Sequence, residues 1–259
     1  MTIGTRGRGS RKYKYKKKTN KKAIDAAVKR AVTRGVTSYS SIRARSLIPS
    51  KAVIKFPYTA LITQFTPDAT ATEDFRANTF IINDIFDPDV GLIGDNNITA
   101  TGFQHIFGTS ENNYKDGIYQ EFCVLKCDIQ VDFCNEGGVN GAPVIVATYF
   151  NGVNNADLSY RTMTNQPIYY QEKILGNEVS GSSVTTLRRR FDAARFSGDD
   201  VRDIEREKGA FNRSPDNRVY LYVMSRSMNQ SNSEKVQLRV KLHYTVECTV
   251  PRDLQQGDD

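Results

Sequence analysis

Residues 237–250, QLRVKLHYTVECTV, alternate between apolar and polar side chains over their whole length. Such alternation is typical of a β-strand that has one face buried in a core and the other in water. The stretch therefore predicts a long, half-buried strand. The side chains expected to face the core are Leu238, Val240, Leu242, Tyr244, Val246, Cys248 and Val250, and those expected to face water are Arg239, Lys241, His243, Thr245 and Glu247.

A second long strand is predicted over residues 120–134, QEFCVLKCDIQVDFC. Cys123 and Cys127 would then lie on one face, about 13 Å apart along the strand, which is too far for a disulfide. The chain has four cysteines and no CxxC pair, so we expect all of them to be reduced. The predicted core face contains Cys123, Leu125, Cys127, Ile129, Val131 and Phe133, and the predicted outer face contains Lys126, Asp128, Gln130 and Asp132.

Beyond residue 50, the rest of the chain also consists mainly of short segments with the pattern of β-strands. Pro57 inside one predicted strand indicates an edge position or a bulge, and residues 143–150 are apolar on both faces. Residues 199–208 are acidic first and basic last, which predicts one short helix within a loop. Further strands are predicted at residues 52–64, 75–83, 143–150, 166–174, 183–191 and 218–226.

Long polar connections separate several of these strands, at 84–118, 151–182 and 192–217. Such connections favour jelly-roll topology over a simple meander. The predicted fold is all-β: a single eight-stranded jelly roll of two packed antiparallel sheets, preceded by a disordered basic arm. Two small Greek-key domains are the structural alternative, but no Pro/Gly-rich linker divides this part of the chain.

The net charge of +7 over 259 residues conceals two regions of opposite sign. Residues 1–50 contain 15 Lys and Arg and one acid, Asp25, for a charge of +14. Residues 51–259 contain 21 Lys and Arg against 28 acids, for a charge of −7. The expected organisation is an arm at 1–48, a jelly-roll domain at 49–252 and a short acidic tail at 253–259.

The first 22 residues, MTIGTRGRGSRKYKYKKKTNKK, combine like charges with small polar residues and cannot form a core. A dense polycation of this kind binds nucleic-acid phosphates in a salt-sensitive, sequence-independent way. Tyr13 and Tyr15 could stack on unpaired bases. The residues expected to bind nucleic acid are Arg6, Arg8, Arg11, Lys12, Tyr13, Lys14, Tyr15, Lys16, Lys17, Lys18, Lys21, Lys22, Lys29, Arg30 and Arg34.

Two other roles are open for the arm. It has the composition of a nuclear-localisation signal, or it is a plain solubility tail; a membrane anchor is disfavoured because no apolar face accompanies the charges. Residues 21–34 place Ile24, Ala27, Val28 and Ala31 at helical spacing, which predicts a marginal helix. The nuclear-localisation residues would be Arg11, Lys12, Lys14, Lys16, Lys17, Lys18, Lys21 and Lys22.

A catalytic constellation is not recognisable in the sequence, and we expect the protein not to be an enzyme. The two histidines, His105 and His243, are 138 positions apart, and neither a P-loop nor a nucleophile-elbow motif is present. Asp87, Asp89 and Asp95 are better interpreted as loop carboxylates than as a calcium site, because calcium requires six or more oxygen ligands. No cofactor and no metal are expected. No apolar run approaches the length of a transmembrane helix, and no secretory signal is expected.

Residues Phe80–Asp89, FIINDIFDPD, resemble the strand-to-loop element of capsid proteins of circular, Rep-encoding single-stranded DNA (CRESS-DNA) viruses, the circovirus-like group. Residues 102–105 (GFQH), residues 114–119 and the strand with the sequence TLRRRF, within 184–191, also resemble that family. The arm departs from the circovirus type, since it mixes Lys with Tyr instead of forming a long Arg run. A separate, related lineage is therefore expected.

The resemblance implies a structural protein of the virion that self-assembles into an icosahedral T=1 shell of about sixty copies. It also implies packaging of single-stranded DNA by the arm, and passage through the host nucleus with nuclear import receptors as partners. Alternatives are a capsid protein of a satellite-type RNA virus, or a non-viral single-stranded nucleic-acid-binding β-sandwich. A secreted lectin-like jelly roll is disfavoured by the polycationic arm.

Overall fold

The computed structural model describes most of the chain after residue 48, and residues Pro49–Arg252 form one compact unit. The helix expected at 21–34, the arm and the tail at 253–259 lie outside the described residues. The described residues are 49–65, 75–90, 99–108, 117–137, 141–154, 158–166, 168–177, 181–228 and 234–251.

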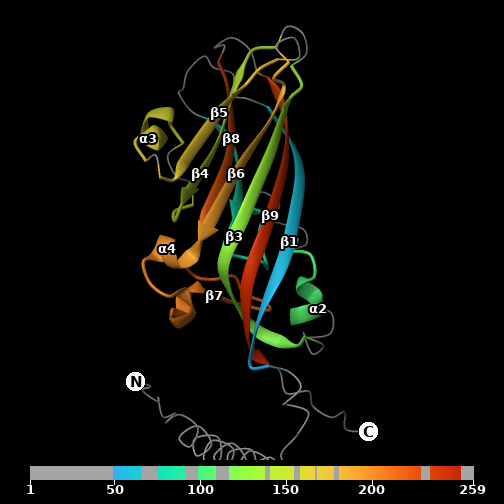
Figure 1. Ribbon diagram of the computed structural model, residues 1–259, viewed down its shortest axis with the longest axis vertical. Helices are drawn as coiled ribbons and strands as arrows, with labels where there is room; N and C mark the ends of the chain where they lie inside the picture. The colour runs from blue at the N-terminus through green and yellow to red at the C-terminus, as the bar shows by residue number, and fades with distance from the viewer. Residues whose placement is uncertain are drawn as a thin grey trace, which may run out of the picture. The chain divides into compact units, whose positions relative to one another are not determined.

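The described residues form two antiparallel sheets that pack face to face (Figure 1). The first sheet has the strand order β1-β9-β3-β6, with the three-residue β7 paired to β3, and the second has the order β2-β8-β4-β5. The strands are β1 (Lys51–Phe65), β2 (Arg76–Ile81), β3 (Tyr119–Asn135), β4 (Val144–Asn151), β5 (Tyr170–Leu175), β6 (Val184–Asp192), β7 (Lys208–Ala210), β8 (Tyr220–Ser227) and β9 (Lys235–Pro251).

The strand pairs are nested, and this nesting defines the topology. The first strand pairs with the last, β1 with β9, and the second with the last but one, β2 with β8. Inside them, β3 pairs with β6 and β4 with β5, all antiparallel. One long antiparallel ribbon folded over in this way is a jelly roll. The predicted fold class is confirmed, and the two-domain alternative is wrong because both sheets combine strands from the two halves of the chain.

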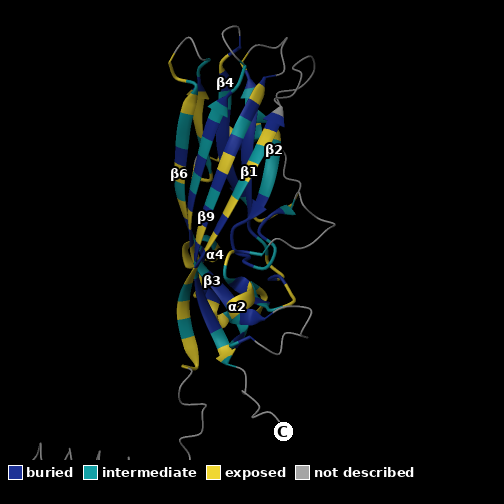
Figure 2. Cartoon of the chain, turned by 90° about the vertical axis from the view of Figure 1, so that its right-hand side faces the viewer, coloured by how far each residue is buried: buried dark blue, intermediate teal, exposed yellow. Residues whose placement is uncertain are grey.

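The first sheet turns one face to the core and one to water. Figure 2 shows the alternation of exposed and less exposed residues along β1 and β9. The edge position expected from Pro57 is confirmed, since β1 ends the strand order. Val250 was expected in the core, but it is 44% exposed because its positive φ of 55° turns it out of the strand register. The other predicted core residues of β9, Leu238, Val240, Leu242, Tyr244, Val246 and Cys248, are buried.

A β-bulge in β3 corrects part of the predicted pattern. The pairing with β9 shifts register between Val124 and Lys126, so Leu125 is an extra residue and the alternation changes phase there. Phe122 and Val124, not Cys123 and Leu125, therefore face the core beside β9. Cys123 is buried on the opposite face, where its Sγ lies 3.6 Å from the carbonyl oxygen of Val201. All four cysteines are free, as expected.

The two central strands of the second sheet, β4 and β8, are buried on both faces. On its inner face Phe80, Leu221 and Val223 pack toward the first sheet, whereas Met224 and Tyr222 of β8 point the other way into a second apolar cluster. This outer cluster includes Met163 of α3 (Tyr160–Thr164), so the helix covers the sheet. The burial of both faces of β4 matches the prediction from the continuous apolar run. The cluster comprises Phe75, Ile81, Ala147, Tyr149, Met163, Tyr220, Tyr222 and Met224.

The remaining elements are short and lie in the connections. They are α2 (Phe103–Phe107), α4 (Ala193–Ser197) and the 3-10 turns η3 (Val201–Asp203) and η4 (Glu205–Glu207). The single helix predicted over 199–208 is wrong: Ile204 adopts an extended conformation that separates the two turns, and β7 begins at Lys208. In the described part of the chain, no helix is long and apolar enough to cross a membrane.

Candidate nucleic-acid interface

All the residues predicted to bind nucleic acid or to direct nuclear import, from Arg6 to Arg34, lie outside the described residues. The structure shows a further charged surface on the jelly-roll body, which cannot be recognised from the sequence of any single strand. This surface is the outer face of the first sheet, where four strands bring charged side chains into rows.

The register between strands defines these rows. Across β1, β9, β3 and β6, one row is Lys55–Thr245–Lys126–Asp192 and the next is Pro57–His243–Asp128–Arg190. Three further rows follow: Thr59–Lys241–Gln130–Arg188, then Leu61–Arg239–Asp132–Thr186, and finally Thr63–Gln237–Cys134–Val184. We call these five rows the basic face. It contains six Lys and Arg and three Asp, a net charge of +3, within a body whose total is −7.

Each carboxylate of the basic face is bound to a cation of the same face. Arg190 donates from Nε to Asp128, and Lys126 lies 3.3 Å from Asp192. Arg239 approaches Asp132 with Nη2 at 2.7 Å from Oδ2. These pairs are partly or fully exposed, so solvent screens them and each adds little to the stability of the fold. Their effect on the surface is larger, since they neutralise every acid there.

Asp132 is the most tightly held of the three acids. Burial, the largest single effect, raises the pKa of Asp132, but hydrogen bonds from Thr186, Arg239 and Gln130 together outweigh it and lower the pKa below the ordinary value. The Thr186 hydroxyl donates at 2.8 Å and the Gln130 amide at 2.9 Å. Because these partners come from β3, β6 and β9, the carboxylate fastens three strands together.

Three cations of the basic face have no carboxylate partner among the described residues: Lys55, Arg188 and Lys241. Lys241 and Arg188 share a row, with Gln130 between them. Lys55 and Arg188 are exposed, and Lys241 is half-buried by its neighbours. The basic face therefore keeps a net excess of positive charge.

The three consecutive arginines of β6 divide between two roles. Arg188 and Arg190 lie on the basic face, whereas Arg189 points to the other side. There its guanidinium stacks 4.3 Å from the ring centroid of Phe150 and donates to the carbonyl oxygens of Ile168 and Tyr169. Arg189 thus fixes a loop of the body and does not contribute to the exposed charge.

A separate cluster lies beyond the Lys55 row, next to the bulge in β3. Glu247 was expected to face water, but it is only 8% exposed because Arg202 of η3 and Lys51 of β1 both pair with it, at 3.1 and 3.3 Å. Burial, together with Glu207 and Glu247, raises the pKa of the adjacent Cys123 thiol to about 11. A thiol with that pKa is a poor nucleophile at neutral pH, so this cluster is structural.

The FIINDIFDPD segment also has a structural role. The Asn83 amide oxygen accepts from the backbone of Val219 at 2.8 Å, and its nitrogen donates to the carbonyl of Asn217 at 2.7 Å. Ile81 donates from its backbone to the carbonyl oxygen of Pro88 at 2.9 Å. These bonds fix the exit of β2 against the entry to β8.

The acids of that segment are held inside the protein. Asp84 is fully buried, and burial raises its pKa, partly offset by Ser214 and by the backbone of Phe86. Asp89 accepts a hydrogen bond from the hydroxyl of Tyr58 at 3.2 Å. Among the described residues, no group of three or more His, Cys, Asp or Glu side chains is arranged to hold a metal ion. Asp95 lies outside that part of the chain.

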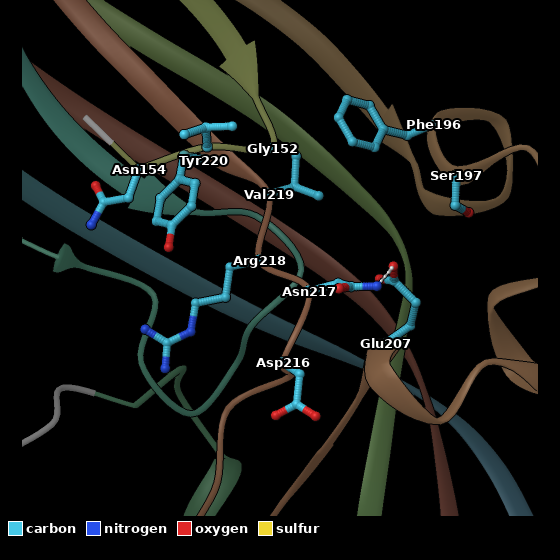
Figure 3. A pocket seen from close by; sticks show the side chains of 11 residues that line it. Gly152, Asn154, Phe196, Ser197, Glu207, Asp216, Asn217, Arg218, Val219 and Tyr220 are labelled. Carbon is cyan, nitrogen blue, oxygen red and sulfur yellow. Dashed lines mark hydrogen bonds between the residues drawn. The ribbon is translucent and has the colours of Figure 1, made fainter. Parts of the chain in front are cut away.

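An open pocket of about 530 Å³ lies where the loop after β4, α4 and the segment before β8 meet (Figure 3). Asn217 donates to Glu207 within it at 3.1 Å, and the side chains of Asp216 and Arg218 extend from the same segment. The lining contains neither His nor Cys. It is lined by Gly152, Val153, Asn154, Phe196, Ser197, Glu207, Asp216, Asn217, Arg218, Val219 and Tyr220.

No family model and no curated protein matches the chain. Solved structures do resemble it. The capsid protein of BFDV, crystallised as a decamer, is 10% identical with a TM-score of 0.38, over 76% of this chain and 99% of that one. A particle of the giant freshwater prawn Macrobrachium rosenbergii nodavirus is 9% identical with a TM-score of 0.42, over 78% and 95%. Mud crab tombus-like virus is 8% identical with a TM-score of 0.41, over 85% and 98%.

Proposed function

We propose that the chain is a capsid subunit, which assembles with copies of itself into a closed icosahedral shell and packages single-stranded DNA through its basic arm. The observation that carries this proposal is the joining of a +14 segment to a complete jelly roll of opposite net charge. Jelly rolls serve in capsids, lectins and cupins. Of these three roles, the capsid is the one that gives a reason for a polycation of this density on one end of the chain.

The charge division suits a container for nucleic acid. The arm neutralises phosphates and releases their counterions, which favours assembly around a polyanion. Both termini of the jelly roll, at β1 and β9, lie in one sheet as neighbouring strands. Along the chain, the arm is followed directly by β1, an edge strand of this sheet. The segments 1–48, 49–252 and 253–259 are proposed to act as arm, shell domain and tail.

The edges of the sandwich suit contacts between copies. The edge strand β1 exposes Val53 and Leu61, and β5 and β6 expose Ile174 and Val184 at the opposite edge. Unpaired strand edges with apolar side chains favour association. The long connections between strands would supply the remaining contacts. The family resemblance of FIINDIFDPD favours a CRESS-DNA virus, with the Lys-rich stretch also serving nuclear import, and a T=1 shell.

Deleting residues 1–34 tests the role of the arm. We expect the truncated chain to fold and to lose packaged nucleic acid, because 13 of the 15 cations of residues 1–50 are removed. The measurement is the nuclease-protected nucleic acid per subunit after purification. A variant with residues 1–34 shuffled, which keeps every charge, is the matched control and should package normally.

Co-purification of the truncated chain with nucleic acid at the full-length ratio would refute the arm's role. Sequencing the protected nucleic acid distinguishes the two viral possibilities. DNA agrees with the proposal, and RNA would instead indicate the satellite-type alternative.

A further inference from the structure

We propose that the basic face of the β1-β9-β3-β6 sheet is a second nucleic-acid-binding surface, which binds the phosphate backbone of the packaged single strand independently of its sequence. The inference rests on the proposed function, since it names a second contact for the same packaged strand. It differs from the arm in kind, because the face is a rigid part of the folded body.

The basic face has more cations than its aspartates can pair with. Arg190, Arg239 and Lys126 satisfy all three aspartates of the face, which leaves Lys55, Arg188 and Lys241 with full positive charge. A face that served only to keep the body soluble would require no such excess, in a body whose total of −7 means −10 outside this +3 face. Complementarity to a polyanion is the simplest function of unpaired cations held on one surface.

The three unpaired cations lie close enough together to contact one strand of nucleic acid. Lys241 and Arg188 lie two strands apart in one row, about 10 Å between backbones. Lys55 lies four residue pairs along the sheet from the Lys241 row, about 13 Å away. Gln130 lies between Lys241 and Arg188 in one row. Pro57 and His243 lie in the row between Lys55 and Lys241, where Asp128 is already paired with Arg190. The three cations thus form a triangle on the outer face of one sheet.

The basic arm is covalently connected to the sheet that carries the basic face. β1, which carries Lys55, begins at Lys51, so the basic arm is tethered to an edge of this sheet. A nucleic acid bound by the arm is therefore presented to the face at high effective concentration, and weak contacts there add to the total affinity. A face of net +3 suffices for this role, although it would bind poorly alone.

Binding of oligonucleotides to the full-length chain tests the proposal. The face variant is Lys55→Gln, Arg188→Gln and Lys241→Gln, which removes three charges without breaking an ion pair. The control variant is Arg76→Gln, Arg161→Gln and Arg213→Gln, three exposed arginines in β2, in α3 and before β8, which removes equal charge from elsewhere on the body. Each protein is titrated with a 30-nucleotide oligothymidine, and with oligouridine of equal length, at several salt concentrations.

The face variant should lower the slope of log K against log salt by about 2, since each phosphate contact to a single strand contributes about 0.7. The control variant should retain the wild-type slope with both probes. An unchanged slope for the face variant, or an equal loss in both variants, would overturn the proposal. Thermal unfolding of both variants verifies that each is folded.

Lysine acylation of the wild-type chain gives a second measurement that requires no variant. Oligothymidine should protect Lys55 and Lys241, whereas Lys173 of β5 should react equally with and without it. Protection of Lys55 and Lys241 in protein freed of nucleic acid would instead assign the face to a second copy, and would overturn the proposal. If wild-type protein forms no particles, the proposed function fails, but the slopes still decide the role of the face.

Discussion

The two sheets of this jelly roll differ in strand length and in what covers their outer sides. The β2-β8-β4-β5 sheet has an apolar outer face buried under α3 and Phe75. The β1-β9-β3-β6 sheet keeps its outer face open and charged over five rows. The β2-β8-β4-β5 sheet thus has apolar packing on both sides, whereas the β1-β9-β3-β6 sheet separates the core from solvent.

This difference explains the two sequence patterns. A strand buried on both faces is mainly apolar, as β4 and the first five residues of β8 are. A strand with one face in water alternates between apolar and polar residues, as β9 does. It also explains where charge can be placed. The open sheet presents Lys and Arg of three neighbouring strands and of β1 in register, so it is the larger ordered array of charge on the described body.

The largest expected effect concerns the covered face. Replacing Met224, which is fully buried between β8 and α3, by Ala should lower the free energy of unfolding by about 2–5 kcal/mol, because a cavity opens in the outer cluster. Leu61→Ala on the open sheet is the control. That side chain is 74% exposed, and the change should stay within about 0.5 kcal/mol. Urea denaturation measures both, and equal losses would contradict the contrast between the sheets.

A smaller effect is expected from pH, with opposite signs for two aspartates. Burial raises the folded pKa of Asp84 above its ordinary 3.8, so its contribution to stability is full below that pH and is lost as pH rises through the folded pKa. Asp84→Asn should therefore gain stability relative to wild type as pH rises from 4 toward neutrality. Denaturation at several pH values measures the difference.

Asp132 on the basic face provides the matched comparison. Its folded pKa is lowered through the hydrogen bonds from Thr186, Arg239 and Gln130, so its contribution is present above the ordinary 3.8 and is lost as pH falls through the folded pKa. Asp132→Asn should be less stable than wild type at neutral pH, by an amount that shrinks below pH 4. If the stability of both variants relative to wild type changed in the same direction with pH, the opposite pKa shifts of Asp84 and Asp132 would be contradicted.

Much of the fold followed from local patterns. The framework strands, the double burial of β4 and the edge position of Pro57 depend on period and on proline geometry, which are properties of short segments. The phase of β3 before Leu125 was not predictable in this way. The bulge is defined by pairing with β9, more than a hundred residues later, and no glycine marks it.

The basic face could not be predicted from single segments either. The wet sides of β9 and β3 were predicted separately, but their union with β6 into rows requires the strand order, which no single segment contains. The ion pairs that select the free cations join residues as distant as Asp132 and Arg239. Likewise, nothing local distinguishes Arg189, which fixes a loop, from Arg188 and Arg190 on the face.

Electron microscopy of the expressed full-length chain tests the central claim most directly. If the jelly roll is a shell subunit, the protein should form uniform closed spheres about 200 Å across, a size that follows from packing sixty domains of this mass at interior density. They should contain nucleic acid. A sample of monomers or small oligomers that binds nucleic acid without forming spheres would contradict the account, and would indicate a single-stranded nucleic-acid-binding module instead.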